Sequence, residues 1–208
     1  VYKRQNYACS KILEAKFKLG LFENRFVDED DISEKIFNQY HKETALKLAR
    51  QGIVLLKNND VLPLRRPINS KNRILVTGPN ANNQSILGDW HSAQPDENVH
   101  TVFEGIKKIG TEMGYLVDYH DSNENIKRIS EKDIDKTIEV ASDYDMVILV
   151  IGDNSMRYKW NQKTAGENTA RAELDLAGKQ LDLAMRLKES GKNLSLIHIS
   201  EPTRQSSI

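Results

Sequence analysis

The stretch "DMVILVIG" constrains the fold more than any other part of the chain, because residues 146–151 form an unbroken apolar run. A strand that is covered on one face alternates apolar and polar residues, whereas a strand covered on both faces is apolar throughout. Such strands lie at the centre of parallel sheets that carry helices on both sides. The run is also far too short to span a bilayer, which takes about 20 residues. It therefore predicts the central strand of a parallel α/β sheet.

Helical and strand-like patterns alternate around this run. Three other apolar runs predict strands, namely "GIVLLKN" at 52–58, "RILVTG" at 73–78 and "YLVDYH" at 115–120. The expected helices have apolar residues at helical spacing and occupy 37–48, 101–109, 130–141 and 174–188. In the last of these helices, the predicted buried face is Leu174, Ala177, Leu181 and Met185. Thr101 with Glu104, and Ser130 with Asp133, have the spacing of capping boxes that begin two of the helices.

This alternation predicts an α/β fold, an open, mostly parallel three-layer sandwich over residues 37–193. We expect the sandwich to be incomplete, because the helix that ends at Lys188 should lead into another strand near residue 193. Residues 6–22 predict one amphipathic helix over 6–19 that is ended by Gly20. The acidic stretch 23–36 has no periodicity and is expected to be an exposed linker.

The two ends of the chain are related through the genetic code. Residues 1–5, "VYKRQ", can be encoded GTG TAT AAG AGA CAG, and the reverse complement of this DNA encodes "LSLIH", residues 194–198. Inverted copies of one oligonucleotide therefore bracket the chain, as in translated library-adapter DNA. We expect residues 1–5 and 194–208 to be foreign and exclude them from the fold prediction.

Composition and motifs argue against several classes of protein. Thirty basic residues balance thirty acidic ones, so no charge excess favours nucleic acid or an anionic membrane surface. Cys9 is the single cysteine, which excludes an internal disulfide and a cysteine-based zinc site. The sequence has no glycine-rich phosphate loop, no G-x-S-x-G elbow and no histidines at ligand spacing. We therefore expect no cofactor and no metal.

Ligands of open parallel sheets bind beyond the carboxyl ends of the strands, so the loops there are candidate sites. Three loops stand out: "NNDVLPL", "GPNANNQSILGDWHS" and "DNSMRYKWNQKTAGENTAR". Trp90, in the second loop, is either a plug over the sheet edge or a flat face for a sugar ring. Glu167, in the third loop, is either a solvated glutamate of a flexible insertion or a functional carboxylate, because long unstructured loops are often functional.

Taken together, these stretches resemble glycoside hydrolase family 3, the family of β-glucosidases and β-xylosidases. "ILEAKFKLGLFEN" resembles the end of the family's N-terminal β/α barrel, and "RQGIVLLKNNDVLPL" resembles the entry into its α/β sandwich. "ILVTGPNAN", "LGDWHS", "VHTVFEGIKK" and "ASDYDMVILVIG" follow in family order. "GENTARAELDLAGKQ" is similar to the pattern G-E-x-x-x-R-x-x-L-x-L-P-x-x-Q, with Ala177 in place of the proline.

The resemblance implies a fragment of a retaining, exo-acting glycoside hydrolase, a β-glucosidase first and a β-xylosidase next. It implies that Glu167 is the general acid/base, and that Trp90, Asp89 and Trp160 contact the substrate, a β-linked oligosaccharide or aryl glucoside. Arg171 is expected to anchor the loop. The nucleophile would belong to the missing barrel, so the fragment alone is expected to be inactive. A periplasmic or secreted location is favoured by the resemblance.

Two other classes of function remain open. A non-catalytic carbohydrate-binding or scaffolding module accounts for Trp90 equally well, and loss of affinity without loss of chemistry on mutation of Glu167 would distinguish it. A free-standing nucleotide binder is disfavoured by the missing phosphate loops.

Overall fold

The computed structural model describes residues 2–66 and 72–199, and the chain divides into two units, Val1–Lys57 and Asn58–Ile208. The first unit contains α1 (Tyr2–Lys18), a short 3-10 turn (Glu29–Asp31), α2 (Ile32–Lys35) and α3 (Gln39–Gly52). The expected first helix is present, although it begins within residues 1–5.

The linker expected at 23–36 stays a prediction, whereas the strand expected at 52–58 is wrong. The stretch 23–36 is exposed as expected, but it contains the 3-10 turn and α2, because the side chain of Asp28 accepts a hydrogen bond from Asp30 N and begins helical structure there. "GIVLLKN" forms no strand: Ile53 is extended, and Ile53–Leu56 are exposed and belong to no helix or strand. Extended backbone becomes a strand only when another strand accepts its hydrogen bonds, and the sheet of the described residues has no strand before residue 73.

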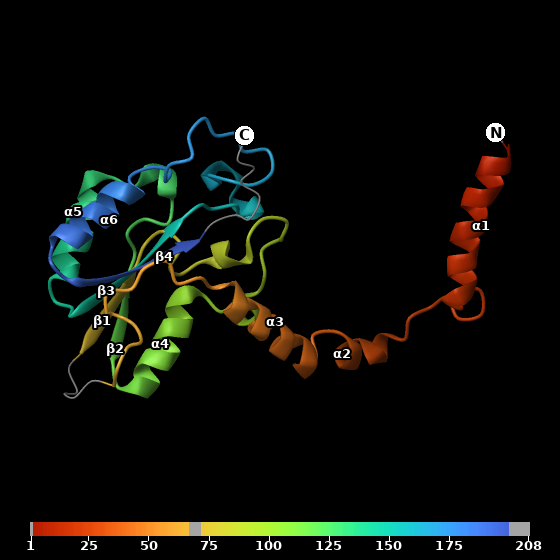
Figure 1. Ribbon diagram of the computed structural model, residues 1–208, viewed down its shortest axis with the longest axis horizontal. Helices are drawn as coiled ribbons and strands as arrows, with labels where there is room; N and C mark the ends of the chain where they lie inside the picture. Colours follow the sequence, from red (N-terminus) through yellow and green to blue (C-terminus); the bar gives the residue numbers. More distant parts are fainter. Residues whose placement is uncertain (1, 67–71, 200–208) are drawn as a thin grey trace. The chain divides into compact units, whose positions relative to one another are not determined.

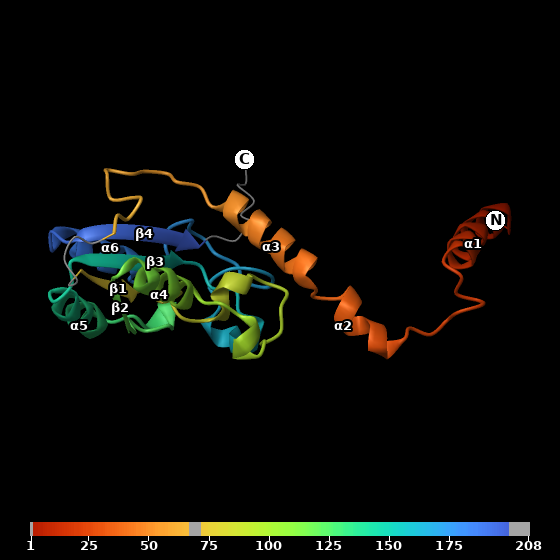
Figure 2. The same cartoon turned by 90° about the horizontal axis from the view of Figure 1, so that it is seen from below.

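In its described residues, the second unit is built on a four-stranded parallel sheet of order β2-β1-β3-β4. Its strands are β1 (Arg73–Thr77), β2 (Leu116–His120), β3 (Met146–Gly152) and β4 (Asn193–Ile199). The predicted central strand is confirmed, because β3 is buried along its whole length and pairs on both sides. Figure 2 shows β4 at one edge of the sheet.

Helices cover both faces of this sheet, which confirms the predicted α/β sandwich (Figure 1). On one face, α5 (Glu131–Ala141) and α6 (Gln180–Glu189) pack over Val147, Leu149 and Ile151. On the other face, α4 (Val102–Met113) packs over the alternate residues of β1 and β3. Both predicted capping boxes are present, at the first residues of α4 and α5.

The last helix differs from its prediction in both its start and its buried face. It begins at Gln180, so Leu174 and Ala177 precede it. Leu183, Ala184 and Leu187 are buried, whereas Leu181 is 55% exposed and Met185 is also exposed. The buried amide of Gln180 explains the difference, because it accepts from Gly152 N at 2.8 Å and donates to Gly152 O at 2.9 Å. These bonds fix the rotation of the helix about its axis.

A strand follows α6 near residue 193, as expected, and it falls on the stretch that we predict to be foreign. β4 pairs with β3 from Asn193 to Ile199. Edge pairing uses backbone N–H and C=O groups, which any strand-forming sequence supplies. The pairing is therefore compatible with either origin of this stretch, and its foreign origin stays a prediction.

Candidate functional site

Two of the three expected loops meet at the carboxyl end of the sheet. The loop that follows β1 carries Asp89 and Trp90, and the loop that follows β3 carries Glu167. Direct contacts join them, because Arg157 and Glu167 of the loop after β3 both bond to the Asp89 carboxylate of the loop after β1. We call the residues of these two loops that contact one another the candidate site.

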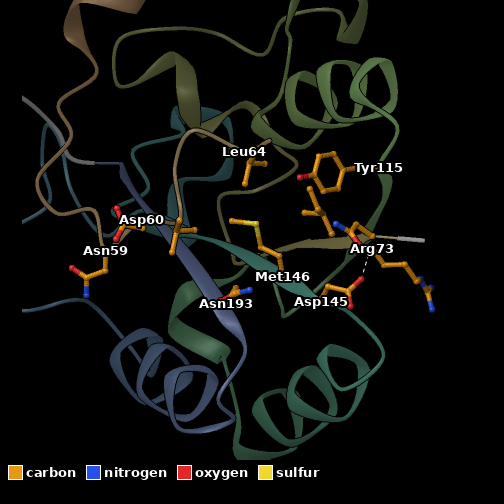
Figure 3. Close-up of a pocket in the computed structure, with 11 residues that line it drawn as sticks. Asn59, Asp60, Leu64, Arg73, Tyr115, Asp145, Met146 and Asn193 are labelled. Atoms are coloured by element: carbon orange, nitrogen blue, oxygen red, sulfur yellow. Dashed lines mark hydrogen bonds between the residues drawn. The ribbon is translucent and has the colours of Figure 1, made fainter. Parts of the chain in front are cut away.

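The remaining loop, "NNDVLPL", is not at this end, so its assignment to the carboxyl edge is wrong. With no strand preceding it, it lies at the amino ends of β1, β3 and β4, where Asn59, Asp60 and Leu64 line a cavity of about 240 Å³ (Figure 3). Asp145 closes part of this cavity by accepting a hydrogen bond from Arg73 N at 2.8 Å.

Trp90 is held in a conformation that displays its ring. Its φ is +60°, in the left-handed region that non-glycine residues rarely adopt, and 74% of the residue is exposed. The guanidinium carbon of Arg157 lies 3.8 Å from the ring centroid, a cation–π arrangement. One face of the indole is therefore covered by Arg157, and the rest of the ring is open.

The Asp89 side chain is only 8% exposed and accepts several hydrogen bonds. Its Oδ1 accepts from Trp90 N and from Arg157 Nε, both at 2.9 Å, and lies 3.6 Å from Lys163 Nζ. Its Oδ2 accepts from Glu167 N at 2.6 Å. Burial raises the pKa of Asp89, but the hydrogen bonds from Glu167 and Trp90, with the nearby cations, outweigh it and hold the pKa below its usual value.

Glu167 is fixed by its backbone and reaches out with its side chain. Its N–H donates to Asp89, and its carbonyl accepts from Lys163 Nζ at 2.9 Å. The side chain is 41% exposed, and its carboxylate forms an ion pair with Arg157 Nη2. This pair also raises the pKa of Arg157. The Glu167 carboxylate is therefore exposed at the surface, while two hydrogen bonds hold the Glu167 backbone in place.

Gly166 allows this close approach. Its φ is +89°, and a Cβ added there would lie 2.3 Å from Asp89 Oδ2 and 3.1 Å from Ser155 Cβ. Any side chain at 166 would therefore have to displace the carboxylate that binds Glu167 N.

Arg171 and Trp160, the other two predicted residues, lie on either side of Glu167 in sequence but do not bond to its carboxylate in any described contact. Arg171 Nη1 donates to the buried Asp153 Oδ1 at 2.7 Å, and Nη2 donates to the carbonyl of Asp175. These bonds fit a residue that anchors the loop. The Trp160 ring lies 4.6 Å below Lys163 Nζ and is half exposed.

Sequence reasoning missed the two basic residues of the site, Arg157 and Lys163. Lys163 is 1% exposed, so its ammonium group is buried next to Asp89 and the Glu167 carbonyl. The only signal in the sequence was a run rich in basic and aromatic residues, "MRYKWNQK", inside a loop with no predicted structure.

Within residues 2–66 and 72–199, no group of three or more His, Cys, Asp or Glu side chains is arranged to hold a metal ion. None of the helices in that part of the chain is both long enough and apolar enough to cross a membrane.

A family model decides the class of protein. Residues 53–205 match the model of the glycosyl hydrolase family 3 C-terminal domain. The chain belongs to this family. The match covers the sandwich with its candidate site, and it agrees with the resemblance found in the sequence.

Individual relatives support the assignment. The chain is 32% identical over 202 residues to a β-xylosidase of Formosa agariphila, and the alignment covers 93% of the chain and 26% of that protein. It is 27% identical to the periplasmic β-glucosidase of Salmonella typhimurium, covering 91% of the chain and 27% of that protein. The chain also superposes on the solved structure of a β-glucosidase involved in saponin metabolism, from intestinal bacteria, with a TM-score of 0.75 and 29% identity. The superposition covers 94% of this chain and 29% of the β-glucosidase chain. The chain thus spans about a quarter of the length of these relatives.

Proposed function

We propose that this chain is part of a retaining, exo-acting β-glycosidase, a β-glucosidase first and a β-xylosidase next, in which Glu167 is the general acid/base. The observation that carries the proposal is the display of Glu167: a backbone tied to Asp89 and Lys163 bears a side chain that is 41% exposed at the carboxyl end of the sheet. The printed names of the relatives, β-xylosidase and β-glucosidase, favour this chemistry.

The proposed chemistry uses Glu167 in both of its protonation states. In a retaining enzyme, one carboxylate attacks the anomeric carbon while a second carboxyl group, about 5 to 5.5 Å away, protonates the leaving oxygen. The resulting carboxylate then accepts a proton from the water that releases the sugar. Glu167 paired with Arg157 corresponds to the state that receives this proton.

The attacking carboxylate is proposed to come from an upstream barrel outside this chain. Asp89, the carboxylate that bonds to the Glu167 backbone, is unsuited to attack because both of its oxygens already accept hydrogen bonds from the protein. We therefore expect the chain by itself to be inactive. We propose a periplasmic or secreted location, in line with the periplasmic relative.

Trp90 is proposed to form part of the sugar subsite, with a β-linked oligosaccharide or aryl glucoside as substrate. Its exposed ring offers the flat apolar surface on which a pyranose can stack. Trp160 is a second candidate, with one side of its ring beneath Lys163.

The experiment is to replace Glu167 with glycine in the full-length protein and compare aryl glycosides with good and poor leaving groups. Loss of the acid slows poor leaving groups by about 10² to 10⁴-fold, and slows activated ones much less in the first step. An equal loss on both would remove Glu167 from this role. Unchanged chemistry with weaker sugar binding would favour the alternative, a non-catalytic carbohydrate-binding module, which the display of Trp90 also suits.

A further inference from the structure

The Asp89 carboxylate connects Trp90, in the loop after β1, to three residues of the loop after β3: Arg157, Lys163 and Glu167. It bonds to the backbone of Glu167, to the side chain of Arg157 and to the backbone of Trp90. Lys163 lies 3.6 Å from the same carboxylate and also bonds to the Glu167 carbonyl. With both oxygens occupied by protein donors and 8% of its side chain exposed, Asp89 has little capacity left for sugar hydroxyls.

Arg157 extends this connection to the two groups that would meet substrate. Its Nε donates to Asp89, its Nη2 pairs with the Glu167 carboxylate, and its guanidinium lies against the Trp90 ring. A planar guanidinium can do all three at once, because its donors lie in the plane and its faces are free for stacking. Arg157 therefore contacts both the carboxylate of Glu167 and the ring of Trp90.

We propose that Asp89 is a positioning residue that, through Arg157, fixes the Glu167 carboxylate relative to the Trp90 ring. A leaving group that stacks on Trp90 then lies within reach of the group that protonates it. This inference rests on the proposed function of Glu167, and it replaces the expectation that Asp89 binds the sugar.

The local charges explain why an aspartate is needed at this position. Two cations, Arg157 and Lys163, face two anions, Asp89 and Glu167. Without the Asp89 charge, the buried ammonium of Lys163 keeps a carbonyl and the Trp160 ring, neither of which carries a charge. Arg157 keeps its ion pair with Glu167 and its contact with the Trp90 ring. An unpaired buried cation is unfavourable, so the loop is expected to rearrange rather than keep its geometry.

The first test uses the 208-residue chain and needs no catalysis. Hydrogen exchange is followed at the amide of Glu167 in the parent chain, in Asp89→Ala and in Asp182→Ala, an exposed helix aspartate that serves as the control. Loss of a bond to a charged acceptor should accelerate exchange at residue 167 by about tenfold or more in Asp89→Ala. The control should not change it. Unaltered exchange in Asp89→Ala would overturn the proposal.

The second test measures catalysis in the full-length protein with Asp89→Asn, Arg157→Lys and Arg157→Met. A misplaced proton donor lowers kcat/KM for poor leaving groups by about 10²-fold, with a smaller loss for activated ones. Arg157→Lys should lose less kcat/KM than Arg157→Met, because lysine keeps the positive charge although it lacks the planar set of donors of arginine. If Asp89 and Arg157 serve stability alone, all leaving groups lose rate equally, and this outcome contradicts the proposal.

The two tests also separate this inference from the proposed function. If Glu167→Gly shows no dependence on the leaving group, the acid/base role fails whatever the exchange data show. If Glu167→Gly shows that dependence while Asp89→Asn and Arg157→Met do not, the acid/base role stands and the positioning role fails. Should Asp89→Ala not fold, Asp89→Asn and Arg157→Lys carry the test, because the first keeps the shape of the side chain and the second keeps its charge.

Discussion

The backbone N–H of Glu167 donates to the carboxylate of Asp89 at 2.6 Å, across 78 positions of sequence. This bond joins the loop after β3 to the loop after β1 at the carboxyl end of a parallel sheet, where open α/β proteins bind their ligands. It places the proposed acid/base beside the proposed sugar platform, and it makes the geometry of Glu167 depend on a buried charge.

Gly166→Ala is expected to weaken this junction. The added Cβ would lie 2.3 Å from Asp89 Oδ2, and φ at this position is +89°, so substitution should cost about 1–3 kcal/mol through strain alone. Urea unfolding of the chain measures the loss. The control is Gly105→Ala, which lies within α4 with open space around it and should be neutral or stabilising. Equal effects of the two substitutions would contradict this account of Gly166.

Trp90→Ala is expected to weaken substrate binding rather than abolish chemistry. The open part of the indole is the surface proposed for the sugar, and its loss removes apolar contact area from the ground state and the transition state alike. In the full-length protein, KM should rise by about tenfold or more, while kcat falls much less. Trp90→Phe should keep part of the affinity. A fall in kcat at constant KM would be the contrary result.

The junction is expected to loosen in acid. Because the pKa of Asp89 is lowered in the folded chain, its contribution to stability is present above its unfolded pKa of about 3.9, and it is lost as pH falls through the lower folded value. The measurement is tryptophan fluorescence against pH in a Trp160→Phe background, where Trp90 is the remaining tryptophan. Trp90 fluorescence should change when Asp89 is protonated, because Arg157, which bonds to Asp89, is stacked on the Trp90 ring. Asp89→Asn should remove the transition below pH 4. The same transition persisting in Asp89→Asn would assign it to another group.

The buried face of α6 can be checked with a pair of leucines. Leu183→Ala should cost about 2–5 kcal/mol, because Leu183 is fully buried against β3, whereas Leu181→Ala should change stability little. Urea denaturation of both variants measures the difference. Similar losses at the two positions would restore the face predicted from the sequence.

These leucines also show where prediction from the sequence succeeded and failed. The β3 strand and both capping boxes were predictable, because an unbroken apolar run and a Ser/Thr with an acid three residues later are local signals. The face of α6 was not, because Gln180 sets it through bonds to Gly152, which lies 28 positions away. The strand predicted at 52–58 was wrong for a related reason, because a strand also needs a partner strand, and residues 52–58 alone do not show whether one is present.

The candidate site divides in the same way. Glu167 and Trp90 could be found from their place in loops that follow strands and from a family pattern. Arg157 and Lys163 could not, because their roles come from contacts with Asp89, which is 68 positions from Arg157. Asp89 itself was chosen, but for contact with sugar, and its burial favours a positioning role instead.

The most direct test of the account is chemical rescue of the Glu167→Gly variant in the full-length protein. The full-length reading frame is first determined by sequencing the source DNA upstream of Asn6 and downstream of Asn193. With an activated aryl glycoside and added azide, the account predicts that activity returns and that the product is the β-glycosyl azide, because the small anion enters the space left by the acid/base carboxylate. Glu173→Gly, a nearby exposed glutamate, should be unaffected by azide. No rescue of Glu167→Gly, or an azide product of the α configuration, would contradict the assignment of Glu167 as the acid/base of a retaining β-glycosidase.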